Sequence, residues 1–299
     1  MSRRIITSLL TILVAAVVVV GATTAFFSDT ETSVGNTFAA GDIDLQIDNT
    51  SYAIDWNIPG FQNPTGAFVA STHTSWTMRD LTVEKFFDFV DLKPGDYSED
   101  TISIHVGSND AWVCAAARIT DDNDNTYVEP EVADDLTVGV DPLLTDGELD
   151  DGLNFAFWVD DGDNVFEDGE QVFLEGPLSG LGEAGQIALA DSNSSILSEG
   201  EPIPGGETFY IGKIWCFGDL TPNQRPDRED PNPQLNNPVN RGTGWTCDGS
   251  FVNNAAQTDV VVGDLQFYAE QARHNDQFSC RENWKPVWPT PTPTPIPTD

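Results

Sequence analysis

Two acidic segments of the chain share one spacing of oxygen-bearing side chains. Residues 122–131 and 161–170 both read D-x-D-N-x5-E. In the twelve-residue calcium loop, carboxylate and amide oxygens at alternate positions converge on one Ca²⁺, and a terminal Glu closes the coordination shell. The spacing therefore predicts that both segments bind calcium.

The match to that loop is incomplete, and it is better in the second segment. Position 1 is Thr120 in the first segment and Val159 in the second, where an Asp is usual. The second segment compensates with Asp160 and with a carboxylate at position 9. The predicted ligands are Asp122, Asp124, Asn125 and Glu131 in the first segment, and Asp160, Asp161, Asp163, Asn164, Glu167 and Glu170 in the second. A chain with 49 acidic residues also forms Asp/Asn turns that hold no metal, which is the alternative interpretation.

The elements that would position these segments have the pattern of β-strands. Apolar and polar residues alternate at 43–47, 101–106 and 264–268, as in half-buried strands. Short apolar runs at 155–159 and 209–211 suit strands buried on both faces. Turns rich in Gly, Pro and Asp separate about ten such strands, and long helical periodicity is scarce. The predicted fold is all-β, a jelly-roll-like β-sandwich.

The composition shifts along the chain predict its domain organisation. We expect one sandwich domain at residues 26–285, with an acidic insertion at about 120–152 and a Pro/Asn-rich insertion at about 218–250. Residues 286–299 are rich in Pro and Thr, which predicts a disordered, extended stalk.

The first 25 residues have the order of a secretory signal peptide, including its helix. Two arginines at positions 3 and 4 precede an apolar run at 5–20, and small residues follow up to Ala25. Cleavage after Ala25 would release a secreted, extracellular protein that touches the membrane only before cleavage. The alternative is an uncleaved anchor, because residues 5–27 are just long enough to cross a bilayer.

The charge of the chain limits the classes of partner that it can bind. There are 49 acidic and 13 basic residues, and the formal net charge is −36. Such a surface repels nucleic acid and anionic membranes and attracts cations. Hydrophobic residues make up 39% of the chain, which is enough for a core and argues against disorder.

The four cysteines predict two disulfides, since their number is even and the chain is exported. Three pairings are open. We favour Cys216–Cys247, which closes the Pro/Asn-rich insertion at its two ends, together with Cys114–Cys280. A zinc site is the alternative, but paired Cys or Cys/His spacing is absent from the sequence.

Several motifs resemble one known family. Residues 27–33 read FSDTETS and residues 37–45 read TFAAGDIDL; LKPGD follows within 91–96, GSNDAW at 107–112, and DLQFYAEQA at 264–272. In order and spacing these blocks are similar to those of the TasA/camelysin family, over the N-terminal third and the last strand. The middle of the chain, about 120–255, is not covered by the resemblance.

The resemblance implies a jelly-roll protein of the cell surface or biofilm matrix. Some members of that family polymerise by donor-strand exchange, and the corresponding donor here is residues 26–38. We therefore expect self-association into fibres through these residues. The alternatives are that they form the first strand of a monomeric surface module, which binds calcium or binds glycans through tryptophans such as Trp56, Trp76, Trp245 and Trp288.

Camelysin is classed as a metalloprotease, so an enzyme has to be considered. The sequence contains no HExxH motif, and its three histidines, at 73, 105 and 274, are far apart. It also lacks the Gly-x-Ser-x-Gly motif of serine hydrolases. We therefore predict no catalytic residues and no cofactor other than calcium.

Overall fold

Antiparallel strands are the main regular structure of the computed structural model, which describes residues 43–55, 67–124, 126, 128–135, 147–183, 185–196 and 200–288. The chain divides into two compact units, residues 1–40 and 41–299, and every described residue belongs to the second. The predicted signal segment, the implied donor at 26–38 and the tail from residue 289 onward lie outside the described residues. Within the described part, no helix is both long and apolar enough to span a bilayer.

The described residues form strands joined by short helical turns. The strands are β1 (Leu45–Asp55), β2 (Ala67–Arg79), β3 (Tyr97–Val106), β4 (Ala111–Asn123), β5 (Leu153–Asp160), β6 (Val172–Pro177), β7 (Gln186–Ala190), β8 (Thr208–Phe217), β9 (Asp219–Pro222), β10 (Trp245–Asp248) and β11 (Val260–Gln271). The helices are α2 (Glu129–Val132), α3 (Leu149–Gly152), α4 (Leu178–Glu183), α5 (Pro238–Arg241), α6 (Cys280–Asn283) and the 3₁₀ turn η1 (Pro233–Leu235). All five strands predicted from alternation or apolar runs are confirmed.

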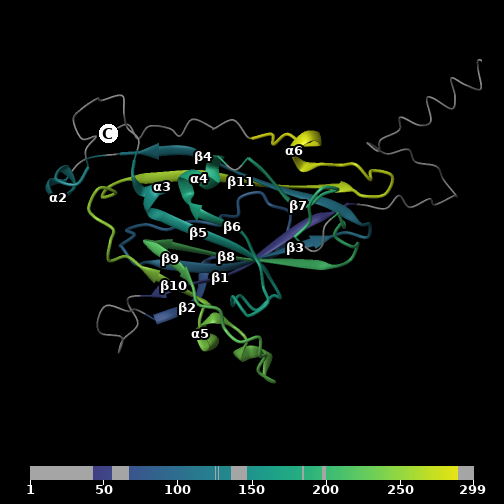
Figure 1. Cartoon of the computed structure of the whole chain (residues 1–299), viewed down its shortest axis with the longest axis horizontal. Coiled ribbons are helices and arrows are strands. Elements are labelled where there is room, and N and C mark those ends of the chain that lie inside the picture. The colour runs from purple at the N-terminus through teal and green to yellow at the C-terminus, as the bar shows by residue number, and fades with distance from the viewer. Residues whose placement is uncertain are drawn as a thin grey trace, which may run out of the picture. The chain divides into compact units, whose positions relative to one another are not determined.

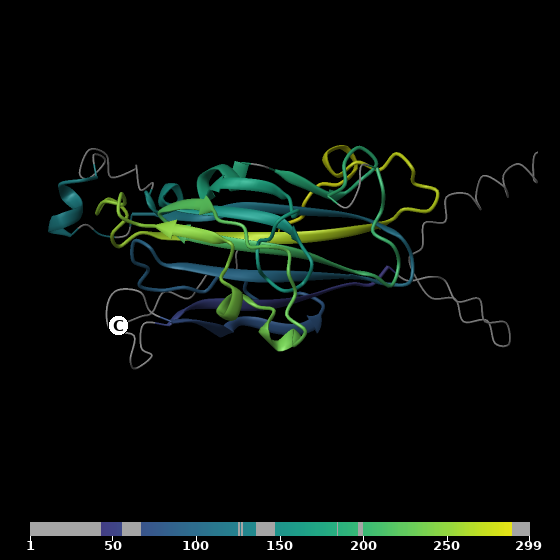
Figure 2. The same cartoon turned by 60° about the horizontal axis from the view of Figure 1, so that its bottom comes forward.

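The strands form two main sheets that pack as a sandwich, confirming the predicted fold class (Figure 1). One sheet has six strands in the order β2-β1-β3-β8-β5-β6, and the other has three in the order β11-β4-β7. In Figure 2, β11 (yellow) lies in one layer and β1 (purple) in another. Ile47, Ile102 and Ile104 of the larger sheet are at most 2% exposed and share one core with Val113 of the smaller sheet.

The outer face of the larger sheet is also covered, over β5 and β8. There Trp158 and Ile214 pack against Phe166 and Trp245, which come from the segments that follow β5 and form β10. Gly212 of β8 leaves room for the Trp158 indole, since a Cβ there would lie 2.0 Å from the ring. This third layer explains why the apolar runs of β5 and β8 do not alternate with polar residues.

The two predicted insertions contain more regular structure than expected. In the second, β9 pairs with β10, so that Asp219 lies opposite Asp248 beside the cysteines. In the first, β4 continues to Asn123 because it pairs with β11, whose Val260 lies opposite Asn123. Sequence composition indicated loops there, but pairing with distant strands extends the sheet into them.

Both favoured disulfides are formed, Cys114–Cys280 and Cys216–Cys247. The first ties β4 to α6 across a sequence separation of 166 residues, and the second spans 31 residues. In the chain-entropy model, loops of these lengths correspond to about 5 and about 4 kcal/mol of stabilisation.

We expect the Cys114→Ser/Cys280→Ser variant to unfold at a lower temperature than Cys216→Ser/Cys247→Ser, because it opens the longer loop. Thermal unfolding followed by circular dichroism measures both, with the reduced wild-type protein as control. An equal loss in the two variants would contradict the loop-length argument.

Candidate metal centres

The segment after β5 folds over the outer face of the larger sheet. Asp160, the last residue of β5, accepts hydrogen bonds through Oδ2 from the backbone N–H groups of Gly162 at 3.1 Å and Asn164 at 3.2 Å. Asn164 has a φ of 66°, a left-handed conformation that Asn tolerates better than most residues. These contacts turn the chain sharply, so that the predicted ligands point back toward one another.

This turn brings the carboxylates of the second segment together. Oxygens of Asp160, Asp161 and Glu170 lie within 4.8 Å of one another, and a second group of the same spacing consists of Asp161, Asp163, Glu167 and Glu229. Glu170 also accepts backbone hydrogen bonds from Asp161 at 3.2 Å and from Glu167 at 2.8 Å, which hold the end of the loop against its start.

One arginine neutralises part of this cluster. Arg241 of α5 pairs with Asp163 at 2.5 Å and with Glu229 at 3.3 Å, and it also contacts Glu167. Among the described residues, no basic side chain forms an ion pair with Asp160, Asp161 or Glu170. The negative charge that lacks a partner is therefore concentrated at the Asp160 end of the loop.

Glu99 adds a fourth carboxylate beneath the loop. It lies on β3, is 0% exposed, and neither Oε1 nor Oε2 has a hydrogen-bond partner among the described residues. Burial raises its pKa well above the ordinary value, and the charges of Asp160, Asp163 and Glu170 raise it further. A buried carboxylate without hydrogen bonds or a paired cation is strongly unfavourable, so Glu99 requires either a proton or a metal ion.

The other acids of the loop have raised pKa values for the same reasons. Burial, followed by neighbouring carboxylates, raises the pKa of Asp160 to about 7 and that of Glu170 to about 9. The pKa of Asp163 is raised to about 6 by burial and by Asp161, although Arg241 opposes this. These acids would ionise together at neutral pH only with a cation among them, and several carboxylates with an amide oxygen suit Ca²⁺.

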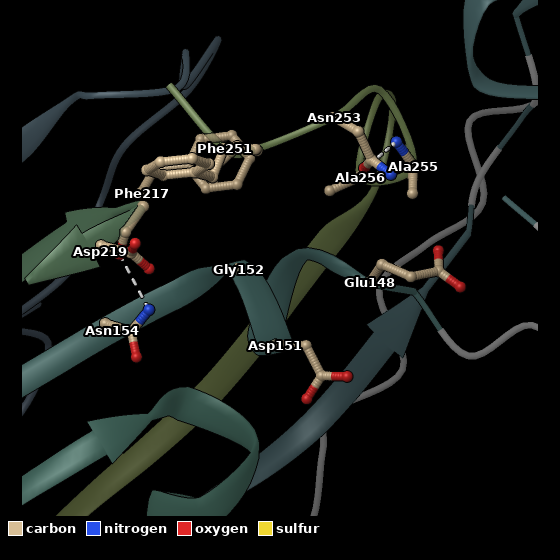
Figure 3. Close-up of a pocket in the computed structure, with 12 residues that line it drawn as sticks. Glu148, Asp151, Gly152, Asn154, Phe217, Asp219, Phe251, Asn253, Ala255 and Ala256 are labelled. Atoms are coloured by element: carbon tan, nitrogen blue, oxygen red, sulfur yellow. Dashed lines mark hydrogen bonds between the residues drawn. The ribbon is translucent and has the colours of Figure 1, made fainter. Parts of the chain in front are cut away.

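A second carboxylate cluster lies at the end of β4. Oxygens of Asp124 and Glu131, which both belong to the first segment, fall within 4.8 Å of an oxygen of the distant Asp259. Asp259 accepts a hydrogen bond from the backbone N–H of Glu148 at 2.7 Å, and the Glu148 carboxyl group interacts electrostatically with Asp259 and Asp124. Figure 3 shows the Glu148 carboxylate pointing away from the neighbouring aromatic residues Phe217 and Phe251.

The second cluster has the same electrostatic signature as the first. Glu131 is 0% exposed. Three buried oxygens have no hydrogen-bond partner among the described residues: Oε1 of Glu131, Oε2 of Glu148 and Oδ1 of Asp259. Burial and neighbouring acids raise the pKa of Glu148 to about 7 and that of Asp259 to about 6.

The structure places the predicted ligands as follows. In the second segment all six lie in or beside the cluster, but Glu167 pairs with Arg241, and the buried Oδ1 of Asn164 has no hydrogen-bond partner among the described residues. In the first segment Asp122 lies within β4 opposite Val261, and Asn125 lies outside the described residues.

Sequence reasoning missed Glu229 and Asp259, which belong to these clusters, and Glu99 and Glu148, which interact with them electrostatically. Glu99 could have been found from the sequence, because it stands beside a second acid inside an otherwise half-buried strand. The other three could not, since their positions depend on contacts between segments far apart in the chain.

The comparison with known families concerns the N-terminal part of the chain. Residues 1–60 match the sequence model of the camelysin metallo-endopeptidase family. The resemblance to the TasA/camelysin family is thus confirmed over these residues. Proteins of the TasA/camelysin type are generally extracellular or attached to the cell surface. The matched region ends just after β1, so it includes neither carboxylate cluster, and no curated protein matches the chain.

Proposed function

We propose that this protein is a secreted or cell-surface structural protein whose sandwich is stabilised by calcium. The observation that carries the calcium proposal is Glu99, a fully buried carboxylate without a hydrogen-bond partner among the described residues, whose pKa is raised by burial and by neighbouring acids such as Asp160 and Glu170. Asp160, Asp161 and Glu170, whose oxygens lie within 4.8 Å of one another, would hold one ion, and Glu99 interacts electrostatically with Asp160 and Glu170. Asp124, Glu131, Glu148 and Asp259 would hold a second. The TasA/camelysin match supports an extracellular setting, where millimolar calcium fills sites of moderate affinity.

We further propose that the protein assembles through residues 26–38 into fibres of a biofilm matrix. What supports this is the TasA/camelysin resemblance together with the edge strand β11. Among the described strands β11 pairs only with β4, and Val260 and Val262 near its start are 42% and 45% exposed. An extended peptide of similar length can add to such an edge through backbone hydrogen bonds.

We expect the chain that starts at Phe26 to form filaments at high concentration with calcium, and the chain that starts at Phe38 to stay monomeric. Negative-stain microscopy and sedimentation measure this. Val260→Lys/Val262→Lys should weaken assembly by charging the edge, whereas Val90→Lys, at a loop residue that is 89% exposed, is the matched control. A Phe26 chain that stays monomeric would rule out the donor-strand proposal without affecting the calcium sites.

We do not propose a peptidase activity, although the matched family bears that description. The three groups of candidate metal ligands among the described residues consist of carboxylates, without a histidine. His105, on β3, contacts Asp48 at 2.6 Å and Thr208 at 2.9 Å through its two ring nitrogens, as expected for a structural sheet residue. A casein cleavage assay with and without zinc tests this, and zinc-dependent cleavage would overturn it.

A further inference from the structure

A polar group lies inside the sandwich, on the face of the larger sheet that is opposite Glu99. It consists of Asn49 on β1, Asp100 on β3 and Lys213 on β8, which are 1%, 0% and 0% exposed. Asp100 lies directly opposite Lys213. Asn49 lies opposite Ile102, which is two residues after Asp100 on β3 and therefore on the same face of the sheet. These three strands are neighbours in the centre of the sheet (Figure 1).

Lys213 is held with its amine against the Asp100 carboxyl group. Its Nζ lies 2.8 Å from Oδ2 of Asp100 and donates a hydrogen bond to the backbone oxygen of Phe86 at 3.1 Å. The ring of Phe87 covers it, with its centroid 3.8 Å from Nζ. By contrast, the side chains of Lys85 and Lys93, which also contact acids, are 62% and 59% exposed.

Asn49 fixes the other oxygen of the same carboxyl group. Its Nδ2 donates a hydrogen bond to Oδ1 of Asp100 at 2.9 Å and another to the backbone oxygen of Thr74 at 2.6 Å. The carboxyl group is therefore held between an amine at one oxygen and an amide N–H donor at the other, without contact with solvent.

The amine and the carboxyl group face each other without contact with solvent. Burial lowers the pKa of the Lys213 ammonium group below its ordinary value, although the charge of Asp100 opposes the shift. The reaction needs one proton to move from Nζ to Oδ2 of Asp100, which lies 2.8 Å away.

We propose that Lys213 and Asp100 condense into a side-chain amide that links β8 to β3 covalently. The Nζ lone pair attacks Cγ of Asp100, and the new C–N bond forms as the C=O electrons move to Oδ1. Oδ2 then leaves with its own proton and one proton from Nζ, as water. The net reaction is amine plus carboxylic acid to amide plus one water, so no oxidant or other reactant is needed.

Two features of the site promote this reaction. Reacting groups fixed in contact have effective concentrations far above those reached in solution, which favours amide formation over hydrolysis in a site without water. Asn49 donates to the oxygen on which negative charge develops, as an oxyanion-stabilising group does. The linkage would reinforce the two central strands of the larger sheet and is independent of the calcium and assembly proposals.

Peptide mass spectrometry of the reduced, denatured and digested full-length protein tests the proposal. We expect a linked peptide containing Lys213 and Asp100, with the summed mass of its two parts less one water. Lys213→Arg should abolish it while keeping the positive charge. Lys93→Arg is the matched control, because Lys93 lies 2.7 Å from Asp91 at an exposed position where water competes.

The rate of linkage provides a second measurement. Asn49→Ala should slow its appearance during refolding at least tenfold. Unlinked peptides containing Lys213 and Asp100 from folded wild-type protein would overturn the proposal. So would a peptide that joins Lys213 to Asn49 with the loss of one ammonia, because Asp100 would then not be the acyl group.

Discussion

At pH 8.5 the protein freed of calcium is expected to melt about 10 °C below its calcium-bound form, and at pH 5.5 the difference should shrink to a few degrees. The reason is that protons and calcium compete for the same carboxylates. At low pH protons neutralise the clusters, whereas at high pH only a metal ion can do so.

The sign follows from the direction of the pKa shifts. Asp160 and Glu170 have folded-state pKa values of about 7 and about 9, above their ordinary values of 3.8 and 4.5. The folded protein without metal therefore binds protons more tightly than the unfolded chain, and its stability falls as pH rises from about 4 to about 9. The shift of Asp160, which is 6% exposed, alone corresponds to about 4 kcal/mol.

The acids with raised pKa values account for the expected change in that pH window. The pKa of Glu84 is lowered to about 2, mainly by backbone N–H groups, so its effect on stability is confined to acidic pH. Glu148, with a pKa of about 7, and Asp163 and Asp259, with pKa values of about 6, also lose protons between pH 5.5 and 8.5. A change between these pH values therefore reports on the acids of both clusters.

Differential scanning calorimetry at both pH values, in EGTA and in calcium, measures this effect. Magnesium at the same concentration is the control. Mg²⁺ is smaller than Ca²⁺ and prefers octahedral coordination, which a crowded carboxylate cluster does not provide. Equal calcium shifts at both pH values, or no shift at pH 8.5, would contradict the proposed sites.

The sequence predicted those features that depend on local spacing. Alternation located β1, β3 and β11, and the Asp/Asn spacing located the loop at 160–170, because a turn needs only neighbouring residues. The pairing of Cys216 with Cys247 followed from the loop that they close. Each of these predictions required no knowledge of how distant strands align.

The features that were missed depend on strand register. Glu99 lies on the sheet face that the 160–170 loop covers because β3 sits next to β8, with Glu99 opposite Ile214. A shift of β3 by one residue would place Asp100 there instead and send Glu99 to the inner face beside Lys213. Neither arrangement can be read from the spacing of residues along one strand. Asp259 likewise joins Asp124 only because β11 pairs with β4 up to Asn123.

Replacing Glu99 by Gln should have opposite effects on the metal-free and calcium-bound forms. Without calcium at pH 8.5, we expect Glu99→Gln to stabilise the fold by about 2 kcal/mol, since it removes a buried charge while keeping the shape of the side chain. In the presence of calcium we expect affinity at the 160–170 site to fall at least tenfold, because one carboxylate facing the ion is lost. Urea unfolding and isothermal titration calorimetry measure the two effects.

Matched variants make this result specific. Glu175→Gln, at an exposed acid on β6 of the same sheet, changes the charge equally and should leave both stability and affinity unchanged. Glu131→Gln should weaken only the Asp124 site, so the two variants should remove different steps of the titration. If Glu99→Gln destabilises the protein without calcium, then Glu99 is already neutralised by a partner in the folded protein. The cluster would in that case be a structural network of shared protons, and the pH dependence above would persist without any response to calcium.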